Sequence, residues 1–283
     1  MLETLKNSRS VDRSANKHRS WREATKPLRA DFSLRRLVNT VILMSGGAVI
    51  VSYPRSGRTW LRVMLHELSI NPVFSHGAAR KMLQGGPDAM RHDIPHYLGN
   101  RVLFLLRDLR DVIVSYFHHC VRQKVWDGDL SGFIRHPIYG FERLMAFDLG
   151  WLEAHSQFRD FAVVRYEDLR QNTEIELRRV AGFLRCRIAG SQALSKVVAE
   201  QAFEQMKNRE KSGELHTRYG KRFTSGSEND NERIVRRGVI GSHVDEMALP
   251  ERDFCEALLA RYNYHATVGR LAAQAAYSGN ARS

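Results

Sequence analysis

The chain has 283 residues, of which 43% are hydrophobic and 27% are charged, a composition that excludes collagen-like, coiled-coil and wholly disordered proteins. Its length suffices for one large α/β domain or two small ones. Lysine and arginine number 44 against 31 acidic residues, so the formal charge is +13 and predicts an anionic partner: nucleic acid, an acidic membrane, or a phosphorylated or sulfated small molecule.

The distribution of the charge favours a small anion over a polyanion. The sequence has no long block of lysine and arginine and no helix-turn-helix, zinc-finger or aromatic RNA-binding signature, so no nucleic-acid partner is expected. It also lacks a run of about 18 apolar residues, so no membrane span is predicted.

Three widely spaced cysteines, Cys120, Cys186 and Cys255, exclude a disulfide framework and favour a reducing, cytoplasmic location.

Residues 1–36 are basic and rich in serine and arginine, and predict a flexible extension ahead of a single α/β domain over residues 37–264. Within this domain, apolar or β-branched runs predict three buried parallel strands, at 48–52, 101–106 and 162–166. A helical pattern follows each strand, at 59–68, from 111 onward and at 173–184. We therefore expect a central parallel sheet flanked by helices, with ligand sites at the carboxyl ends of the strands.

The remaining segments are predicted mainly as loops: 71–99, 122–145 and 208–233, the last a long surface loop or lid. Residues 250–264 indicate a closing helix, and 265–283 a C-terminal extension. Four aromatic residues in the second loop either line an apolar or sugar-stacking pocket or pack in the core: Trp126, Phe133, Tyr139 and Phe141.

The octapeptide Tyr53-Pro54-Arg55-Ser56-Gly57-Arg58-Thr59-Trp60 connects the first strand to its helix, an arrangement that binds phosphate. Gly57 lets the backbone approach an anion, Arg55 and Arg58 add guanidinium donors, and Ser56 and Thr59 add hydroxyls. The Gly-x4-Gly-Lys-[Ser/Thr] pattern of nucleotide kinases is absent, which argues against ATP or GTP hydrolysis. A plain turn after a strand is the alternative interpretation.

A second candidate anion site lies at the end of the strand 101–106. Arg107 follows the strand and Ser115 comes eight residues later in the next helix, so a guanidinium and a hydroxyl can bind one phosphate without a metal ion. Asp108 and Asp111 are expected to pair with Arg110 or to cap the helix.

Together these segments resemble the sulfotransferases that use 3′-phosphoadenosine 5′-phosphosulfate (PAPS), in particular soluble, bacterial-type members. The family's 5′-phosphosulfate loop reads Tyr-Pro-Lys-Ser-Gly-Thr-Thr-Trp; six of its eight positions match, and Arg55 and Arg58 are the departures. The family's 3′-phosphate segment, Arg-[Asn/Asp]-x-[Lys/Arg]-Asp-Val followed by Ser-Tyr, matches throughout residues 107–116. Arg55 can stabilise charge but cannot donate a proton, unlike the lysine that it replaces.

The resemblance spans roughly residues 47–264 and implies a P-loop-like nucleotide-binding core. Three weaker segments supply further donor-binding residues. Tyr166 is implied to lie by the adenine, Phe203 to stack on it, and Arg236, Arg237 and Gly238 to clamp the 3′-phosphate. The alternative for Tyr166 is an aromatic side chain that simply packs at the end of a strand. The alternative for Arg236, Arg237 and Gly238 is an ordinary basic loop.

The resemblance implies transfer of a sulfuryl group from PAPS to a hydroxyl or amine of a small-molecule or carbohydrate acceptor, leaving adenosine 3′,5′-bisphosphate (PAP), with no metal. A histidine suits the proton acceptor. Because His92-Asp93 resembles a His-Asp pair of some members, His92 is the expected catalytic base, acting with Arg55; His76 is the runner-up and His96 a further candidate. The alternative is a non-catalytic nucleotide- or polyanion-binding protein on the same scaffold.

Overall fold

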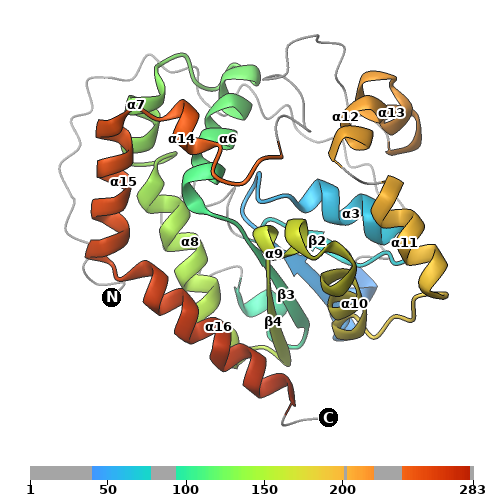
Figure 1. The fold of residues 1–283 in the computed structure, drawn as a ribbon. Coiled ribbons are helices and arrows are strands. Elements are labelled where there is room, and N and C mark those ends of the chain that lie inside the picture. The colour runs from blue at the N-terminus through green and yellow to red at the C-terminus, as the bar shows by residue number, and fades with distance from the viewer. Residues whose placement is uncertain (1–39, 78–93, 201–202, 220–237, 281–283) are drawn as a thin grey trace.

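The computed structural model describes residues 40–77, 94–200, 203–219 and 238–280. Within these ranges, four parallel strands form one sheet in the order β2-β1-β3-β4 (Figure 1). The strands are β1 (Ala48–Val51), β2 (Val73–Ser75), β3 (Arg101–Leu106) and β4 (Asp160–Arg165). The parallel α/β fold and the three predicted strands are confirmed. The strand β2 is an addition, because three residues at a sheet edge leave no clear pattern in the sequence.

The neighbouring strands β1 and β3 bring the two candidate anion sites together. Their register pairs Val49 with Val102 and Val51 with Phe104, so both strands point the same way and end at the same edge. The loop after β1 and Arg107 after β3 therefore start side by side, although about fifty positions of sequence separate them.

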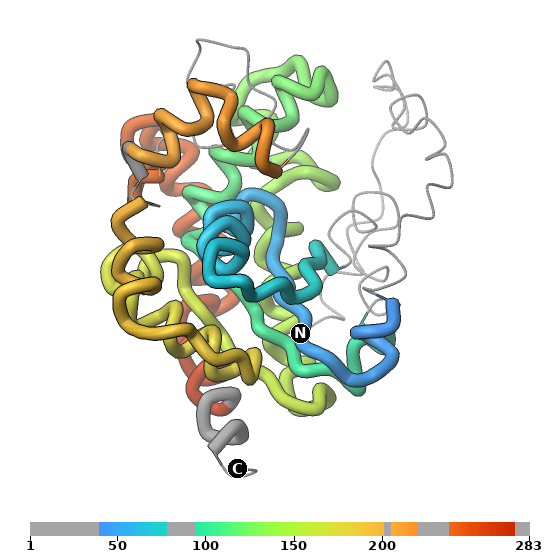
Figure 2. The backbone as a smooth tube through the Cα atoms, turned by 90° about the vertical axis from the view of Figure 1, so that its right-hand side faces the viewer, coloured from blue at the N-terminus to red at the C-terminus, as the bar shows by residue number. Residues whose placement is uncertain are grey.

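Helices cover both faces of the sheet (Figures 1 and 2). One layer holds α6 (Leu109–Arg122), α7 (Leu130–Arg135), α8 (Phe141–Glu153), α14 (His243–Glu246), α15 (Leu249–Arg261) and α16 (Tyr264–Asn280). The other layer holds α3 (Arg58–Glu67), α9 (Tyr166–Gln171), α10 (Thr173–Phe183), α11 (Ser191–Glu200), α12 (Phe203–Lys211) and α13 (Glu214–Tyr219). Two short 3₁₀ helices, η3 (Ile94–Tyr97) and η4 (His155–Gln157), lie close before β3 and β4.

Alternate residues of the strands enter two separate cores, as the period of a strand requires. Val49, Val51 and Phe104 pack with the aromatic side chains of α8. Ile50 and Leu103 pack on the opposite face with α3 and α10. Both layers are needed to bury the apolar strands, so the strand ends, rather than the faces, are left for a ligand.

Two segments predicted as loops contain α-helices. In the segment 122–145, Phe133 and Phe141 are fully buried, and Trp126 and Tyr139 pack against the same core, so the core-packing interpretation of these aromatics is the correct one. In the segment 208–233, the prediction of a loop is wrong as far as residue 219, because Met206 and Leu215 of α12 and α13 bury their side chains against Val63. Residues 220–233 lie outside the described residues.

The helix α16 covers most of the segment that the sequence assigns to a C-terminal extension. It packs on α8 and β4, and its Val268 and Leu271 belong to the core. Across the described residues, no helix combines the length and apolar character that crossing a membrane requires.

Candidate functional site

The loop between β1 and α3 has a backbone suited to wrap around an anion. Arg55 and Gly57 both adopt left-handed conformations, with φ of 74° and 90°. A side chain at position 57 would place its Cβ 2.4 Å from the Tyr166 ring, so only glycine fits there. Gly57 caps α3 without a side-chain hydrogen bond, and the first turn of α3 carries no acidic residue. The positive end of the helix dipole is therefore not neutralised by an acidic side chain of its own first turn.

Arg107 lies directly beneath this loop. Its Nη1 donates to the Arg55 carbonyl oxygen at 3.3 Å, and its guanidinium carbon lies 4.5 Å from the centre of the Tyr166 ring. The side chain is only 9% exposed, and its Nε has no hydrogen-bond partner among the described residues. A buried guanidinium with a donor to spare is suited to an anionic ligand.

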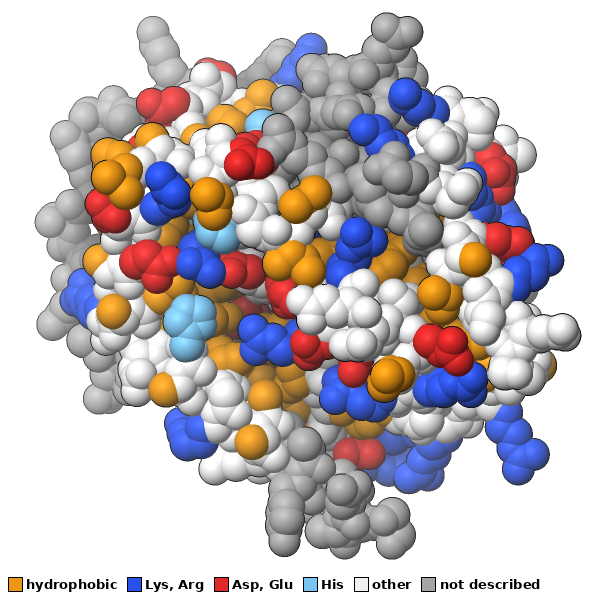
Figure 3. All heavy atoms as spheres, in the orientation of Figure 1, with side chains coloured by type: hydrophobic (Ala, Val, Ile, Leu, Met, Phe, Trp, Pro, Cys, Tyr) orange, Lys and Arg blue, Asp and Glu red, His pale blue; other side chains and the backbone are white. Residues whose placement is uncertain are grey.

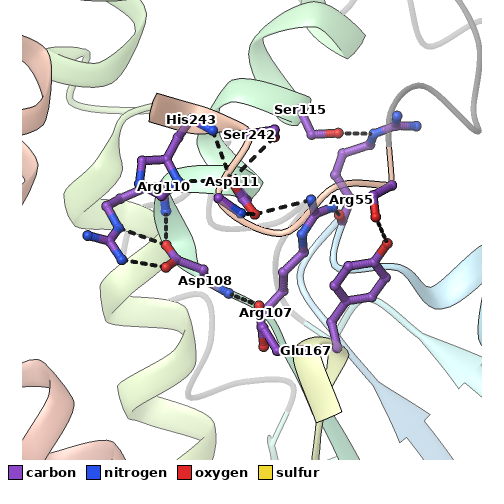
Figure 4. A network of polar contacts seen from close by, with 12 residues as sticks. Arg55, Arg107, Asp108, Arg110, Asp111, Ser115, Glu167, Ser242 and His243 are labelled. Carbon is purple, nitrogen blue, oxygen red and sulfur yellow. Dashed lines mark hydrogen bonds and ion pairs between the residues drawn. The ribbon is translucent and has the colours of Figure 1, made fainter. Parts of the chain in front are cut away.

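The two predicted anion sites meet at one hydrogen bond. Arg55 Nε donates to the Ser115 hydroxyl at 3.0 Å, which joins the loop after β1 to the helix after β3 (Figure 4). The structure thus brings together Arg55, Arg107 and Ser115, three residues that the sequence predicts as ligands. Ser56 is buried within the same loop, and Arg58 and Thr59 begin α3.

Tyr166 lies at the centre of this arrangement, at the start of α9. Its ring meets Trp60 edge-on at 5.9 Å between centroids and lies beneath the Arg107 guanidinium. Its hydroxyl donates to the Gly238 carbonyl oxygen at 3.4 Å. Burial raises the pKa of Tyr166, so the hydroxyl stays a neutral donor at physiological pH. Tyr166 therefore joins the loop, Arg107 and the segment that begins at Gly238.

The two aspartates at the start of α6 have different roles. Asp108 accepts from the Arg110 backbone N–H at 2.9 Å and pairs with the Arg110 guanidinium, as the sequence predicts. Asp111 does not pair with Arg110, which corrects the prediction. It accepts instead from Arg107 and from residues Gly241–His243 (Figure 4). The sequence gives no signal for the contacts with Gly241–His243, because these residues lie about 130 positions from Asp111.

Burial alone would raise the pKa of Asp111, but hydrogen bonds from His243 and the charge of Arg107 outweigh it and hold that pKa at about 2. Asp111 is therefore a carboxylate throughout the physiological range. It supplies a fixed negative charge behind Arg107, on the side away from the loop.

Of the candidate bases in the described residues, His76 is the one beside the loop. It follows β2, its Nδ1 lies 3.1 Å from the Ser52 carbonyl oxygen, and its Nε2 contacts the Arg58 guanidinium. His96 is exposed on η3. His66, a further histidine between the two predicted anion sites in the sequence, is exposed on α3 against Tyr219. His92, the expected base, lies outside the described residues.

Other predicted ligands fall partly outside the described structure. Arg236, Arg237 and the side chain of Phe203 are not described, whereas Gly238 is. Among the described residues no group of three or more histidine, cysteine, aspartate or glutamate side chains is arranged to hold a metal ion.

Comparison with known proteins agrees with this fold, a parallel α/β sheet flanked by helices with a strand-loop-helix turn at one edge. Residues 95–261, more than half of the chain, match the family model described as the sulfotransferase domain. The chain belongs to the sulfotransferase family. The match begins after the loop 53–60, so the resemblance of that loop to the 5′-phosphosulfate loop is a separate observation.

Two relatives illustrate the distance within the family. Sulfotransferase 1B1 of Mus musculus is 22% identical over 253 residues, covering 75% of this chain and 81% of its own. Sulfotransferase 2B1 of Homo sapiens is 28% identical over 199 residues, covering 60% of this chain and 54% of its own.

Solved structures share the fold. Mouse sulfotransferase SULT7A1 complexed with PAP aligns with a TM-score of 0.55 at 16% identity, over 85% of this chain and 93% of its own. Retinol dehydratase in complex with androsterone and the inactive cofactor PAP aligns with a TM-score of 0.53 at 15% identity, over 80% of this chain and 84% of its own.

Proposed function

We propose that this protein transfers a sulfuryl group from PAPS to a hydroxyl or amine of a small-molecule or carbohydrate acceptor. The observation that carries the proposal is the convergence of Arg55, Arg107 and Ser115 at the adjacent ends of β1 and β3. A donor with anionic groups at two positions needs two anion sites within the length of one nucleotide. Family membership and the PAP complexes of the structural neighbours support the same donor.

Each predicted ligand has a part in this proposal. The loop 55–60 holds the 5′-phosphosulfate through backbone N–H groups and the Arg55 guanidinium. Arg107 and Ser115 bind the 3′-phosphate with Gly238, Arg236 and Arg237, and Tyr166 and Phe203 bound the adenine. When bound, PAPS supplies the activated sulfuryl group, and the arginines and the α3 N-terminus stabilise the charge that develops as its bond to the nucleotide breaks.

The geometry favours His76 as the base that accepts the acceptor's proton. Its Nδ1 faces a carbonyl oxygen and must carry the hydrogen, so its Nε2, which faces the Arg58 guanidinium, carries the lone pair. A histidine fixed in one tautomer at the strand ends meets the requirement for a general base. His92 remains the base predicted from sequence and is tested beside it.

Arg58 adds a feature that the family pattern does not have. Its guanidinium contacts the nitrogen that must accept the proton, and it projects from the first residue of α3, where the donor's anionic group binds. Binding of the anion offers Arg58 a stronger partner than a neutral imidazole. We therefore expect Arg58 to turn to the donor and to leave His76 Nε2 accessible.

The same contact favours the second candidate function, a nucleotide-binding protein without catalysis. If Arg58 stays on His76, the base remains covered and no proton is accepted. A transfer assay with labelled PAPS separates the two functions, because only the enzyme releases labelled, sulfated acceptor.

The charge pattern of the surface agrees with a small anionic ligand. On the described part of the face shown in Figure 3, basic and acidic side chains are interspersed instead of forming one continuous basic stripe. A polyanion such as nucleic acid needs such a stripe.

We infer a reducing location such as the cytoplasm, because Cys120, Cys186 and Cys255 are all free thiols.

The donor is tested first by thermal stability. We expect PAP to raise the melting temperature far more than ATP or AMP, and to do so without magnesium. Equal shifts from all three nucleotides would contradict a site for the 3′-phosphate.

The base is tested next, by turnover with labelled PAPS and a library of acceptors. We expect His76→Ala to lower the transfer rate by about 10²- to 10⁴-fold while PAP affinity changes little. The matched control His96→Ala should keep full turnover. A large loss in His92→Ala with normal turnover in His76→Ala would return the role to His92.

A further inference from the structure

The buried carboxylate of Asp111 accepts from more donors than any cap of its own helix would require. Its Oδ1 accepts from the His243 backbone N–H at 3.0 Å, the His243 ring Nδ1 at 2.9 Å and the Ser242 hydroxyl at 3.3 Å. Its Oδ2 accepts from the Gly241 N–H at 2.9 Å and from Arg107 Nη2 at 3.5 Å. Five donors occupy the acceptor capacity that only an ionised carboxylate has.

These donors come from two parts of the chain that the donor site needs side by side. Arg107 precedes Asp111 by one helical turn, and residues 241–243 follow the Gly238 backbone that the Tyr166 hydroxyl contacts. The side chain of Asp111 is 0% exposed, so it does not touch solvent or a ligand. Its effect on a ligand must therefore pass through Arg107 and the 238–243 segment.

The contacts of Arg107 hold its guanidinium in place before any ligand binds. Its guanidinium is held by Asp111, by the Arg55 carbonyl oxygen and by the Tyr166 ring, and its Nε is left without a partner among the described residues. Three contacts on different sides fix the guanidinium plane. An arginine fixed in advance loses little side-chain entropy when it binds a phosphate.

We propose that Asp111 is a positioning residue that sets the selectivity of the donor site for a 3′-phosphate, by holding Arg107 and the 238–243 segment in register. The inference rests on the proposed use of PAPS. Asp111 accepts no hydrogen bond from the 55–60 loop and reaches it only through the Arg107 contact with the Arg55 carbonyl oxygen, so its main effect concerns the 3′ end of the nucleotide.

The test compares two nucleotides that differ only in the 3′-phosphate. Calorimetry on the full chain measures the dissociation constants of PAP and of 5′-AMP for the wild type and for Asp111→Asn. Asparagine keeps the shape of the side chain but replaces one acceptor oxygen with an N–H₂ group. This group faces N–H donors, so the hydrogen bonds to that oxygen are lost. We expect PAP affinity to fall by about 10- to 100-fold and 5′-AMP affinity to stay within about threefold.

The matched control is Asp108→Asn, the same substitution three positions earlier. Asp108 pairs with Arg110 and caps α6, and its carboxylate accepts no hydrogen bond from the described residues Gly241–His243. The PAP and 5′-AMP affinities of Asp108→Asn should therefore both stay within about threefold of wild type. An equal loss of both nucleotides in Asp111→Asn would show a purely structural role and overturn the proposal. A wild type without preference for PAP over 5′-AMP would instead refute the proposed function.

Should Asp111→Asn fail to fold, His243→Gln decides the question. It keeps the carboxylate and the backbone donor and removes only the ring donor to Oδ1. We expect PAP affinity to fall by about 3- to 10-fold with 5′-AMP affinity unchanged. An unchanged ratio of the two affinities would overturn the role of Asp111.

Discussion

The two anion sites are built in opposite ways. The loop after β1 is local: eight consecutive residues supply its backbone turn, its two arginines and the start of α3. The site after β3 is assembled from distant parts, since Arg107 depends on Asp111, Tyr166 and a segment more than a hundred positions later. The residues of the local site all come from one strand-loop-helix unit, whereas those of the distant site come together only once the whole domain has folded.

This difference predicts how each site responds to substitution. A change in the loop should act on the loop and on whatever packs directly against it. A change in the distant network should disturb several elements together, because α6, α9 and the 238–243 segment share the same few hydrogen bonds. Neighbouring residues of one network are also where the effects of two substitutions cease to be additive.

Removing Arg107 should have the largest effect on the donor. Arg107→Ala removes the support of the Arg55 carbonyl oxygen and the charge that faces Asp111 and Tyr166. We expect PAP affinity by calorimetry to fall by about 100-fold or more, since a buried charged partner is lost from the site. Arg110→Ala, which breaks a partly exposed pair with Asp108, is the control and should stay within about threefold. Comparable losses in both variants would show that net charge alone binds the nucleotide.

Gly57→Ala should break the local site and lower stability. The new methyl group lies 2.4 Å from the Tyr166 ring, and φ of 90° is unfavourable for any residue with a side chain. We expect the free energy of unfolding in urea to fall by about 2–4 kcal/mol. Gly182→Ala in α10 has nothing within 4 Å of its new methyl group and should be neutral or stabilise by up to about 1 kcal/mol. Tolerance of alanine at position 57 would mean that the loop and Tyr166 are not in contact in solution.

Asp148 provides a comparison with a buried carboxylate outside both sites. Burial raises its pKa to about 7, while the hydrogen bond from Tyr264 opposes the rise. Because the folded state keeps the proton longer than the unfolded state does, the wild type should lose stability as pH rises from about 4 to about 7 and level off above that.

Asp148→Asn removes this dependence and should be more stable than the wild type at pH 8. The full rise in the pKa of Asp148 corresponds to roughly 4 kcal/mol of unfolding free energy. We expect about 2 kcal/mol, because the protein around an ionised Asp148 rearranges and admits water, which lowers the cost of the buried charge. Parallel urea unfolding at pH 5 and pH 8 measures the difference. A variant whose advantage is the same at both pH values would show that Asp148 ionises normally. Asp111 should behave in the opposite sense, since its stabilising charge is lost only as pH falls from about 4 toward 2.

The contrast between the sites also explains what the sequence could predict. The three apolar strands and the octapeptide 53–60 are contiguous patterns, and the structure has them within a few residues of their predicted ends. The contacts of Asp111 with Gly241–His243 could not be predicted, because its sequence neighbours point to a pair with Arg110, and these partners are brought to it by the packing of the 241–246 segment on α6. His76 follows a strand of three residues, too short to mark a strand end from periodicity.

Ser115 is the point where the local and the distant site touch, and its removal should have the smallest effect. Ser115→Ala deletes the hydroxyl that accepts from Arg55 Nε at 3.0 Å but leaves the Arg107 contacts intact. We expect PAP affinity to fall by about 3- to 10-fold, which corresponds to the net contribution of one ordinary hydrogen bond.

A double-mutant cycle with Arg55→Ala tests whether that bond links the sites. If it does, the double variant should lose less PAP affinity than the two single losses combined, because each single change already breaks the same bond. Ser115→Ala combined with Gly182→Ala is the additive reference. Strict additivity of Ser115→Ala and Arg55→Ala would mean that each site binds its own anionic group independently. The hydrogen bond between the loop after β1 and the helix after β3 would then make no contribution to PAP binding.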